Sequence, residues 1–259
     1  MSERVRRRLE DGVGIVSLNR PEKHNAMDDE MGPLLQDALH WAFDSPDVRC
    51  VLLRGEGPSF CSGRDTTVLG HRARDESDYA FVRRAQDGRL AMLDAGKPIV
   101  AALRGHVIGG GMEMALAADM RVAATDVKLR LPEVRYGILP DTGGTQVLTT
   151  LIGPSRTKYL VMTGESVDGE QALAWGIVDW LVSPEALDDE ALRIAKQLAA
   201  GPPLAVSMAK QLVDQVWGDT VRRGVRAELL AQTTLFKSVD YQEARAALRE
   251  KRTPKYKGK

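Results

Sequence analysis

The stretch Gly105–Ala118, G-H-V-I-G-G-G-M-E-M-A-L-A-A, follows the apolar run Ile99–Leu103 and leads into strong helix formers. This order predicts a strand, a tight turn at the three glycines 109–111, and the start of a helix. Glycine lets the backbone approach a ligand closely, and the first N–H groups of a helix have no partners within it. The turn is therefore a candidate site for an oxyanion or a phosphate. Glu113, in the first turn of the helix, is either a functional carboxylate or a surface residue favoured by the helix dipole.

Strand and helix patterns alternate on both sides of this stretch. Apolar runs predict strands, and apolar residues at helical spacing predict helices. The predicted strands are 13–18, 48–54, 99–103, 120–124 and 128–131, and the predicted helices run from Asp28 or Asp29 to about 44 and from about 77 to 93. The charged segment 71–76 is expected to be exposed. Repeated units of this kind predict an α/β fold.

The pattern changes to consecutive helices after about residue 183. Four helices are predicted, at roughly 184–200, 203–217, 219–237 and 240–251. We place a boundary near residue 195, between an α/β core at 1–195 and a helical C-terminal region at 196–259. Because no low-complexity linker separates them, we expect the two to pack together, or the helices to pack on another subunit.

The amino-acid composition limits the classes of protein to which the chain can belong. With 259 residues, of which 43% are hydrophobic, the chain can bury a substantial core. Lys plus Arg and Asp plus Glu both number 36, so no net charge draws the protein toward nucleic acid or an anionic membrane. The basic cluster at 4–8 is not followed by an apolar segment, which argues against a signal peptide, and no apolar run is long enough to span a membrane.

Cysteine and histidine spacing gives no sign of a disulfide framework or a metal site. The two cysteines, Cys50 and Cys61, are too few for the former, and the four histidines lack the spacing of metal ligands. We therefore expect a reduced, cytoplasmic protein without a bound metal.

Several segments resemble, in their order and spacing, the crotonase family, also called the enoyl-CoA hydratase/isomerase superfamily. They are L-N-R-P-E-K-H-N-A-M at 18–27, F-C-S-G-R-D at 60–65, G-G-G-M-E at 109–113, P-E at 132–133 followed by G-G-T-Q at 143–146, A-L-A-W-G-I-V at 172–178, and E-K-R at 250–252. The resemblance covers nearly the whole chain. It implies a spiral of ββα units, a helical C-terminal region that forms homotrimers or hexamers, and an acyl-CoA thioester as substrate. Coenzyme A then enters as part of the substrate, with no separate cofactor.

The resemblance also implies roles for individual residues. Backbone N–H groups of Arg64 and Gly110 match the positions that hold the thioester oxygen, where preorganised donors stabilise developing negative charge. Glu113 and Glu133 match the two catalytic carboxylates of family hydratases, one acting as base and the other as acid. Like charges sharing a site leave one carboxyl ionised and the other protonated. The chain is thus expected to be a lyase that adds water across the 2,3 double bond of a 2-enoyl-CoA.

Asp141 leaves the reaction open. Some members of the family place a functional aspartate here, as a base in double-bond isomerisation or as a nucleophile. P-D-T-G at 140–143 is also a good type I turn with local capping by the aspartate. The alternatives are therefore an enoyl-CoA isomerase or an acyl-CoA hydrolase using Asp141. A module that only binds phosphate is disfavoured, since neither a P-loop ending nor G-x-G-x-x-G spacing is present.

Coenzyme A contacts are likewise implied by the resemblance. The matching positions are His24, Ala26, Arg64, Asp65, Thr66, Thr67 and Gly110, together with Lys251 for the phosphates of a neighbouring subunit's ligand. For Lys251 a solvated helix face is the alternative. The Arg64 side chain either covers coenzyme A, pairs with Asp65 or faces water. Ala244, Arg245 and Leu248 depart from the commonest form of the tail, so the acyl and adenine environments stay open.

Overall fold

The computed structural model describes residues 4–71 and 75–259. Across these residues the main sheet has the strand order β1-β2-β3-β4-β6-β9. Its strands are β1 (Val5–Glu10), β2 (Val13–Leu18), β3 (Cys50–Gly55), β4 (Ile99–Leu103), β6 (Met120–Ala124) and β9 (Trp180–Val182). The first pair, β1 and β2, is antiparallel and the other pairs are parallel. A smaller sheet joins β5 (His106–Ile108), β7 (Lys128–Arg130) and β8 (Ser166–Asp168).

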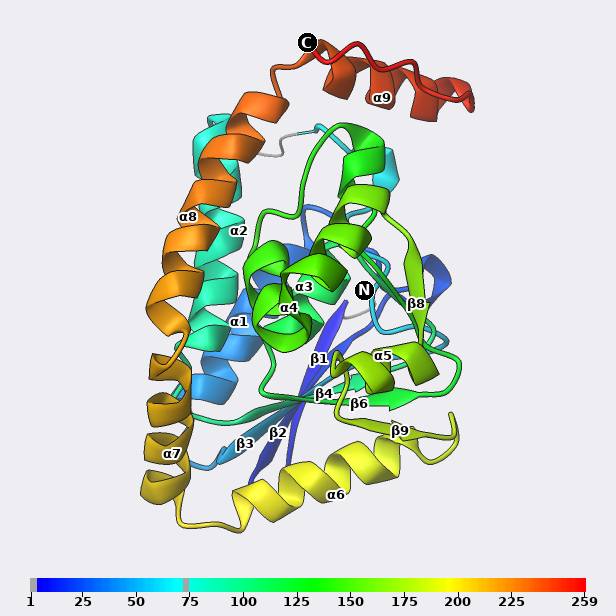
Figure 1. Cartoon of the computed structure of the whole chain (residues 1–259). Coiled ribbons are helices and arrows are strands. Elements are labelled where there is room, and N and C mark those ends of the chain that lie inside the picture. Colours follow the sequence, from blue (N-terminus) through cyan, green and yellow to red (C-terminus); the bar gives the residue numbers. More distant parts are fainter. Residues whose placement is uncertain (1–3, 72–74) are drawn as a thin grey trace.

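Helices cover both faces of the main sheet (Figure 1). They are α1 (Met31–Asp44), α2 (Asp78–Leu93), α3 (Gly110–Leu116), α4 (Gly144–Thr163), α5 (Gly169–Trp175), α6 (Leu187–Ala199), α7 (Pro203–Gln215), α8 (Gly218–Leu235) and α9 (Val239–Glu250). Short 3-10 turns follow at η1 (Pro21–Lys23), η2 (Thr66–Val68) and η3 (Glu133–Tyr136). Within the described ranges, no helix is both long and apolar enough to cross a bilayer.

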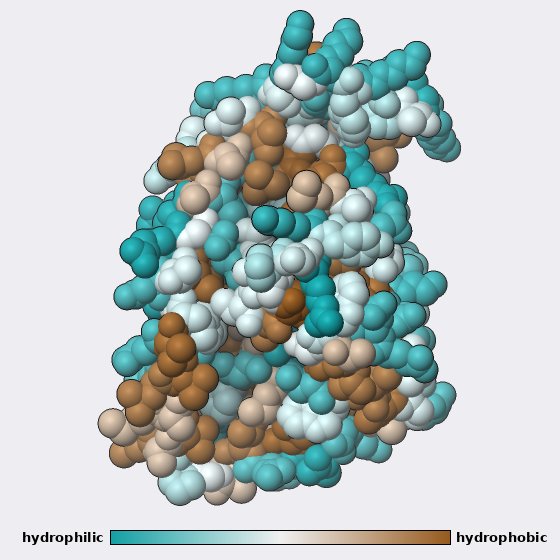
Figure 2. Space-filling view, viewed as in Figure 1, coloured by the Kyte–Doolittle hydropathy of each residue, from teal (hydrophilic) through white to brown (hydrophobic). Residues whose placement is uncertain are grey.

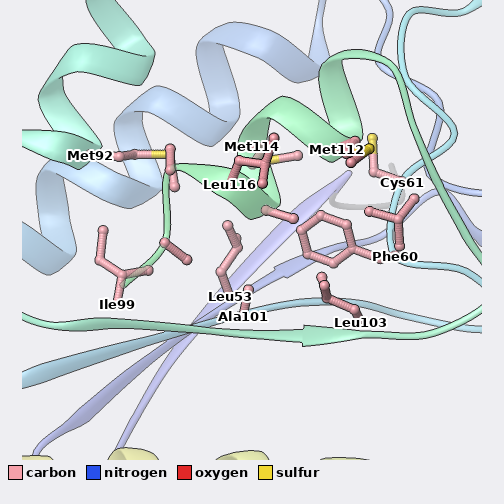
Figure 3. Packing of buried hydrophobic residues seen from close by; sticks show 14 of the residues in the cluster. Leu53, Phe60, Cys61, Met92, Ile99, Ala101, Leu103, Met112, Met114 and Leu116 are labelled. Atoms are coloured by element: carbon pink, nitrogen blue, oxygen red, sulfur yellow. The ribbon is translucent and has the colours of Figure 1, made fainter. Parts of the chain in front are cut away.

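The core lies on the two sides of the parallel strands. Alternate residues of β4 face opposite sides, so Ile99, Ala101 and Leu103 join the cluster around α1 and α3, while Val100 and Ala102 join the one beneath α6. Figure 3 shows the first cluster, in which the β4 side chains pack toward Met112, Met114 and Leu116 of α3. Strands buried on both faces read as the continuous apolar runs seen in the sequence.

The α/β prediction is confirmed, including the predicted strands at 13–18, 99–103 and 120–124. Asp28 caps the start of α1, since its Oδ1 accepts hydrogen bonds from Glu30 N (3.2 Å) and Met31 N (3.0 Å). The predicted C-terminal helices correspond to α6–α9, although α6 begins at Leu187 rather than 184. The boundary at 195 falls within α6 and stays a prediction. Of the charged segment 71–76, residues 72–74 lie outside the described ranges, and His71 and Asp75 are exposed.

Among the described residues, four strands were not predicted: β1, β5, β8 and β9. The basic residues at the N-terminus form β1, whose Arg6, Arg7 and Arg8 are exposed. It is the edge of the sheet, where charged side chains discourage further strand pairing. Because only Val5 of this strand is fully buried, it lacks the apolar alternation that would have predicted it.

Candidate active site

A cavity opens between the start of α3, helices α1 and α2, and the C-terminal helices. It is lined by residues of the α1 region (27–39), the loop on both sides of η2 (63–64 and 69–70), α2 (81–89), the α3 start (110 and 113), the segment 133–142, and Gln232, Phe236 and Tyr241. Arg64, Gly110, Glu113, Glu133 and Asp141 all line it. The structure thus brings together the five residues predicted to be catalytic.

Two glycine turns meet at one end of this cavity. Gly109 has φ +56° and Gly63 has φ +87°, conformations that favour glycine. A Cβ on Gly63 would lie 2.6 Å from Ile108 O, so the close approach of the two segments requires glycine there. The loop carrying Arg64 consequently lies against the first turn of α3.

The N–H groups of Arg64 and Gly110 are free to bind a ligand. Met27 donates its N–H to Gly63 O (2.7 Å) and accepts from Asp65 N (2.9 Å), so the N–H of the intervening Arg64 faces away from Met27. Gly110 is the first residue of α3, where an N–H has no acceptor within the helix. Neither group donates a hydrogen bond to any described residue.

Glu113 is a buried carboxylate held by the start of α4. Its Oε1 accepts hydrogen bonds from Thr142 N (2.8 Å) and Gly144 N (3.0 Å). The side chain reaches this turn because residue 144 is glycine, whose Cβ would lie 3.0 Å from Glu113 Cγ and Oε1. Backbone donors at a helix N-terminus favour the ionised carboxylate. Since both bonds go to Oε1, Oε2 is left for a ligand or water.

The environment of the Glu133 carboxyl group contrasts with that of Glu113. Glu133 begins η3, and its Oε1 lies 2.9 Å from the position of a Cβ on Gly109. Its Oε2 is buried without a hydrogen-bond partner among the described residues. Burial and the nearby charge of Glu113 raise the pKa of Glu133 well above its usual value. This environment favours the protonated form of Glu133, whereas Glu113 accepts two backbone hydrogen bonds, so these two carboxyl groups have contrasting surroundings.

Asp141 also lines the cavity, as do Asp28 and Asp29. Its Oδ2 accepts a hydrogen bond from Gln232 Nε2 (3.0 Å), and its backbone oxygen accepts one from Gln86 Nε2 (2.8 Å). These donors come from α8 and α2, so two helices fix the turn that carries Asp141. This turn is bound by tertiary contacts, which a purely local type I turn does not require.

The chain matches a known protein family along nearly its whole length. Residues 8–259 match the family model described as enoyl-CoA hydratase/isomerase. The chain belongs to this family. It is 34% identical to the carnitinyl-CoA dehydratase of Salmonella arizonae and 33% identical to the 1,2-epoxyphenylacetyl-CoA isomerase of Escherichia coli, with 100% of both chains covered in each case. The structure resembles that of carnitinyl-CoA hydratase from Mycobacterium avium at a TM-score of 0.88, with 27% identity and 100% of both chains covered.

The enoyl-CoA hydratase/isomerase fold of this chain also buries an acidic residue that was not predicted, Glu228, which lies behind the cavity lining. From α8 it accepts hydrogen bonds from Gly143 N (2.8 Å), Thr145 N (3.3 Å) and the Thr145 hydroxyl. Burial and the charge of Glu113 raise the pKa of Glu228 to about 8. Its role in the structure is to hold the α4 turn that in turn holds Glu113.

Arg89 of α2 and Gln232 of α8 were also missed. Both are buried and line the cavity. The sequence did contain a signal for the two polar residues of α8, Glu228 and Gln232. Both lie on the buried face of this helix, which Val221, Val225 and Leu229 define. A polar residue on an apolar helix face is costly unless it has a partner, which marks it as a candidate for function. On α2, the charged residue Arg89 likewise lies on the buried face, together with Val82 and Met92.

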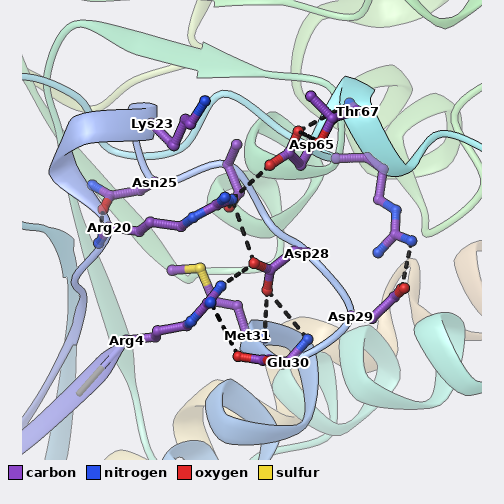
Figure 4. Close-up of polar contacts among 12 residues, drawn as sticks. Arg4, Arg20, Lys23, Asn25, Asp28, Asp29, Glu30, Met31, Asp65 and Thr67 are labelled. Atoms are coloured by element: carbon purple, nitrogen blue, oxygen red, sulfur yellow. Dashed lines mark hydrogen bonds and ion pairs between the residues drawn. The ribbon is translucent and has the colours of Figure 1, made fainter. Parts of the chain in front are cut away.

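The Arg64 side chain has a partner that was not predicted. It forms an ion pair with Asp29 rather than with Asp65. Asp65 instead accepts hydrogen bonds from Arg20 Nη1 (2.7 Å) and Thr67 Oγ1 (2.7 Å), as Figure 4 shows. Although burial opposes it, the bonds from Thr67 and the Arg20 guanidinium lower the pKa of Asp65 to about 2. The side chain of Asp65 thus ties the loop in place.

The remaining positions proposed for coenzyme A do not line the cavity. His24, Thr66 and Thr67 are exposed and Ala26 is buried. His24 Nδ1 lies 3.0 Å from Ser59 Oγ. Lys251 is exposed at the end of α9 (Figure 1). Their contacts with coenzyme A stay predictions.

Proposed function

We propose that this member of the family is an enoyl-CoA hydratase, which adds water across the 2,3 double bond of a 2-enoyl-CoA thioester. The observation that carries the proposal is the contrast between two carboxyl groups in one cavity. Oε1 of Glu113 accepts hydrogen bonds from Thr142 N and Gly144 N, whereas Glu133 is buried with an unpartnered Oε2 and a raised pKa. A base and an acid side by side are what hydration requires.

In this proposal Glu113 is the base. Its carboxylate takes a proton from water while the water oxygen bonds to C3, and the electrons of the double bond move toward the thioester oxygen. Glu133 then gives its proton to C2. The product carries hydroxyl on C3 and a new hydrogen on C2, and transfer of a proton from Glu113 to Glu133, directly or through solvent, restores the starting state.

The N–H groups of Arg64 and Gly110 are proposed to bind the thioester oxygen. Negative charge gathers on that oxygen as water adds, and fixed donors stabilise it without needing to reorient. The two groups are supplied by segments that the glycines at 63 and 109 allow to meet. Because backbone atoms serve, the Arg64 side chain is free to pair with Asp29.

The proposal is tested with Glu113→Gln and Glu133→Gln. Each should reduce the kcat for hydration of crotonyl-CoA by at least about 100-fold, because each removes one proton-transfer group. The dissociation constant of a saturated acyl-CoA, measured by calorimetry, should change little. Unchanged turnover in both variants would contradict the assignment.

An enoyl-CoA isomerase is the second candidate, favoured by the position of Asp141 in the same cavity. One of the relatives is an isomerase of a different CoA thioester, which shows that the family includes rearrangements. Isomerisation moves protons only. Incorporation of oxygen from ¹⁸O-labelled water into the product therefore separates the two reactions.

We also propose that the protein forms a homotrimer or hexamer. Apolar side chains along α7 and at its C-cap recur at four-residue spacing and are exposed in the single chain, from Leu204 (80%) through Met208 (63%) and Leu212 (64%) to Val216 (86%). Figure 2 shows hydrophobic residues gathered over the part of the surface that α7 forms. An apolar stripe of this kind on a helix is typical of a surface that another subunit covers.

A further inference from the structure

Arg89 is a buried cation that the proposed hydration does not use. It lies on α2, is 8% exposed and lines the cavity. Its Nη2 donates to Gly110 O (3.2 Å), its Nη1 meets only Met92 Sδ (3.8 Å), and its Nε has no partner among the described residues. A guanidinium has five N–H donors, so most of this donor capacity is unused by the protein.

The other arginines of the cavity differ from it. Arg64 forms an ion pair with Asp29, and Arg84 forms one with Glu76 at 2.6 Å. No carboxylate of the described residues forms an ion pair with Arg89. Burial lowers the pKa of Arg89, yet an arginine side chain keeps its charge in proteins. A buried charge with so few acceptors is costly, which calls for an acceptor that arrives from outside the chain.

The acidic residues nearby are engaged elsewhere. Glu113 Oε1 accepts from two backbone N–H groups, and Asp141 Oδ2 accepts from Gln232. Burial and the charge of Glu113 raise the pKa of Glu133, which disfavours its charged form. These residues supply part of the electrostatic compensation for Arg89, but none of them makes a hydrogen bond to it.

The position of Arg89 indicates which part of a substrate it meets. Its guanidinium contacts the carbonyl of Gly110, the same residue whose N–H is proposed to bind the thioester oxygen. Standard backbone dimensions then put it within roughly 10 Å of that oxygen. Ala85 and Gly88 of α2 line the cavity beside it and leave room for a chain. In the proposed reaction C2 and C3 face Glu133 and Glu113, so the acyl atoms left to meet Arg89 are those beyond the reacting pair.

We propose that Arg89 forms a subsite for an oxygen substituent on the acyl chain of the CoA thioester. A carboxylate would bind most strongly, because guanidinium and carboxylate form charge-assisted and often paired hydrogen bonds, and a hydroxyl or keto group less strongly. This inference rests on the proposed acyl-CoA binding and names the substrate class within it: acyl groups that carry oxygen beyond C3.

The test uses binding of saturated thioesters, which does not depend on hydration. Calorimetry compares pairs of equal chain length: succinyl- with butyryl-CoA, glutaryl- with pentanoyl-CoA, and adipyl- with hexanoyl-CoA, with 4-hydroxybutyryl-CoA as the neutral oxygenated ligand. In the wild type at least one oxygenated ligand should bind about tenfold more tightly than its plain partner. Arg89→Met should remove this preference, and Arg89→Lys should retain part of it.

Arg89→Gln is the second variant, since its amide can still donate to Gly110 O. Thermal unfolding of all three variants identifies any that fail to fold, and the ratio within each ligand pair cancels a general loss of binding. Equal affinity for plain and oxygenated ligands in the wild type, or the same preference in folded Arg89→Met, overturns the subsite while leaving the proposed hydratase intact. Failure of every acyl-CoA to bind overturns both.

Discussion

Glu113 and Glu228 bind alternate N–H groups of a single turn. Glu113 accepts from Thr142 N and Gly144 N, and Glu228 accepts from Gly143 N and Thr145 N. One carboxyl comes from α3 and the other from α8. The start of α4 therefore separates two acidic groups and provides each with its own donors.

The raised pKa of Glu228 makes stability depend on pH. A carboxyl whose folded-state pKa is raised binds a proton more tightly when folded, so its contribution is present below the usual value of 4.5 and is lost as pH rises through about 8. Glu228→Gln should remove this part of the slope, at most about 1.4 kcal/mol per pH unit. The measurement is the free energy of urea unfolding at several pH values between 5 and 9. Exposed Glu170→Gln is the control, and an unchanged slope in Glu228→Gln would refute the assignment.

Gly109→Ala should damage both stability and activity. Its φ of +56° disfavours any side chain, and the added Cβ would lie 2.9 Å from Glu133 Oε1. The backbone penalty is roughly 1–3 kcal/mol, and displacement of Glu133 adds a fall in kcat. Gly153→Ala is a matched control, because Gly153 has φ +76° with no atom within 4 Å of its Cβ position. If both variants lose kcat equally, contact with Glu133 is not the cause.

Asp141→Asn separates the two candidate reactions. Asparagine keeps the shape of the side chain and an acceptor for Gln232 Nε2, but it removes the negative charge. If Glu113 and Glu133 carry out the reaction, kcat for crotonyl-CoA hydration should fall by less than about tenfold. A loss as large as that of Glu113→Gln would assign the base to Asp141. Isomerisation of a 3-enoyl-CoA is measured in the same preparations.

Leu212→Asp should disrupt assembly. Its side chain is 64% exposed in the apolar stripe of α7, so a charge there would be buried without a partner in an oligomer. Light scattering should then give the mass of a smaller species than the wild type, with circular dichroism unchanged. Thr220→Asp, an exposed polar position at the start of α8, is the comparison. A wild-type monomer at micromolar concentration would end this proposal.

Parts of the fold could be predicted because they follow local patterns. The apolar run 99–103 and the glycines after it predicted β4 and the turn into α3, and helical spacing predicted the C-terminal helices. Edge strand β1 and the short strands β5, β8 and β9 were missed, since three-residue or charged strands carry little periodicity.

The residues of the candidate site likewise include some that could be predicted from the sequence and some that could not. Glu113 and Glu133 were predicted because they match the catalytic carboxylates of the family that the sequence resembles, and they do meet in one cavity. Arg89 and Glu228 are distant in sequence and reach the site only because α2 and α8 pack side by side (Figure 1). Only tertiary packing creates the contact between Glu228 and the α4 turn, so no local sequence motif predicts this contact.

The cavity draws residues from almost the full length of the chain, from Met27 ahead of α1 to Tyr241 in α9. During synthesis the residues of α8 and α9 are among the last to be made. A growing chain in which these helices are still inside the ribosome therefore lacks Gln232, Phe236 and Tyr241, which form one wall of the pocket. The pocket is complete only when the C-terminal helices have packed onto the rest of the chain.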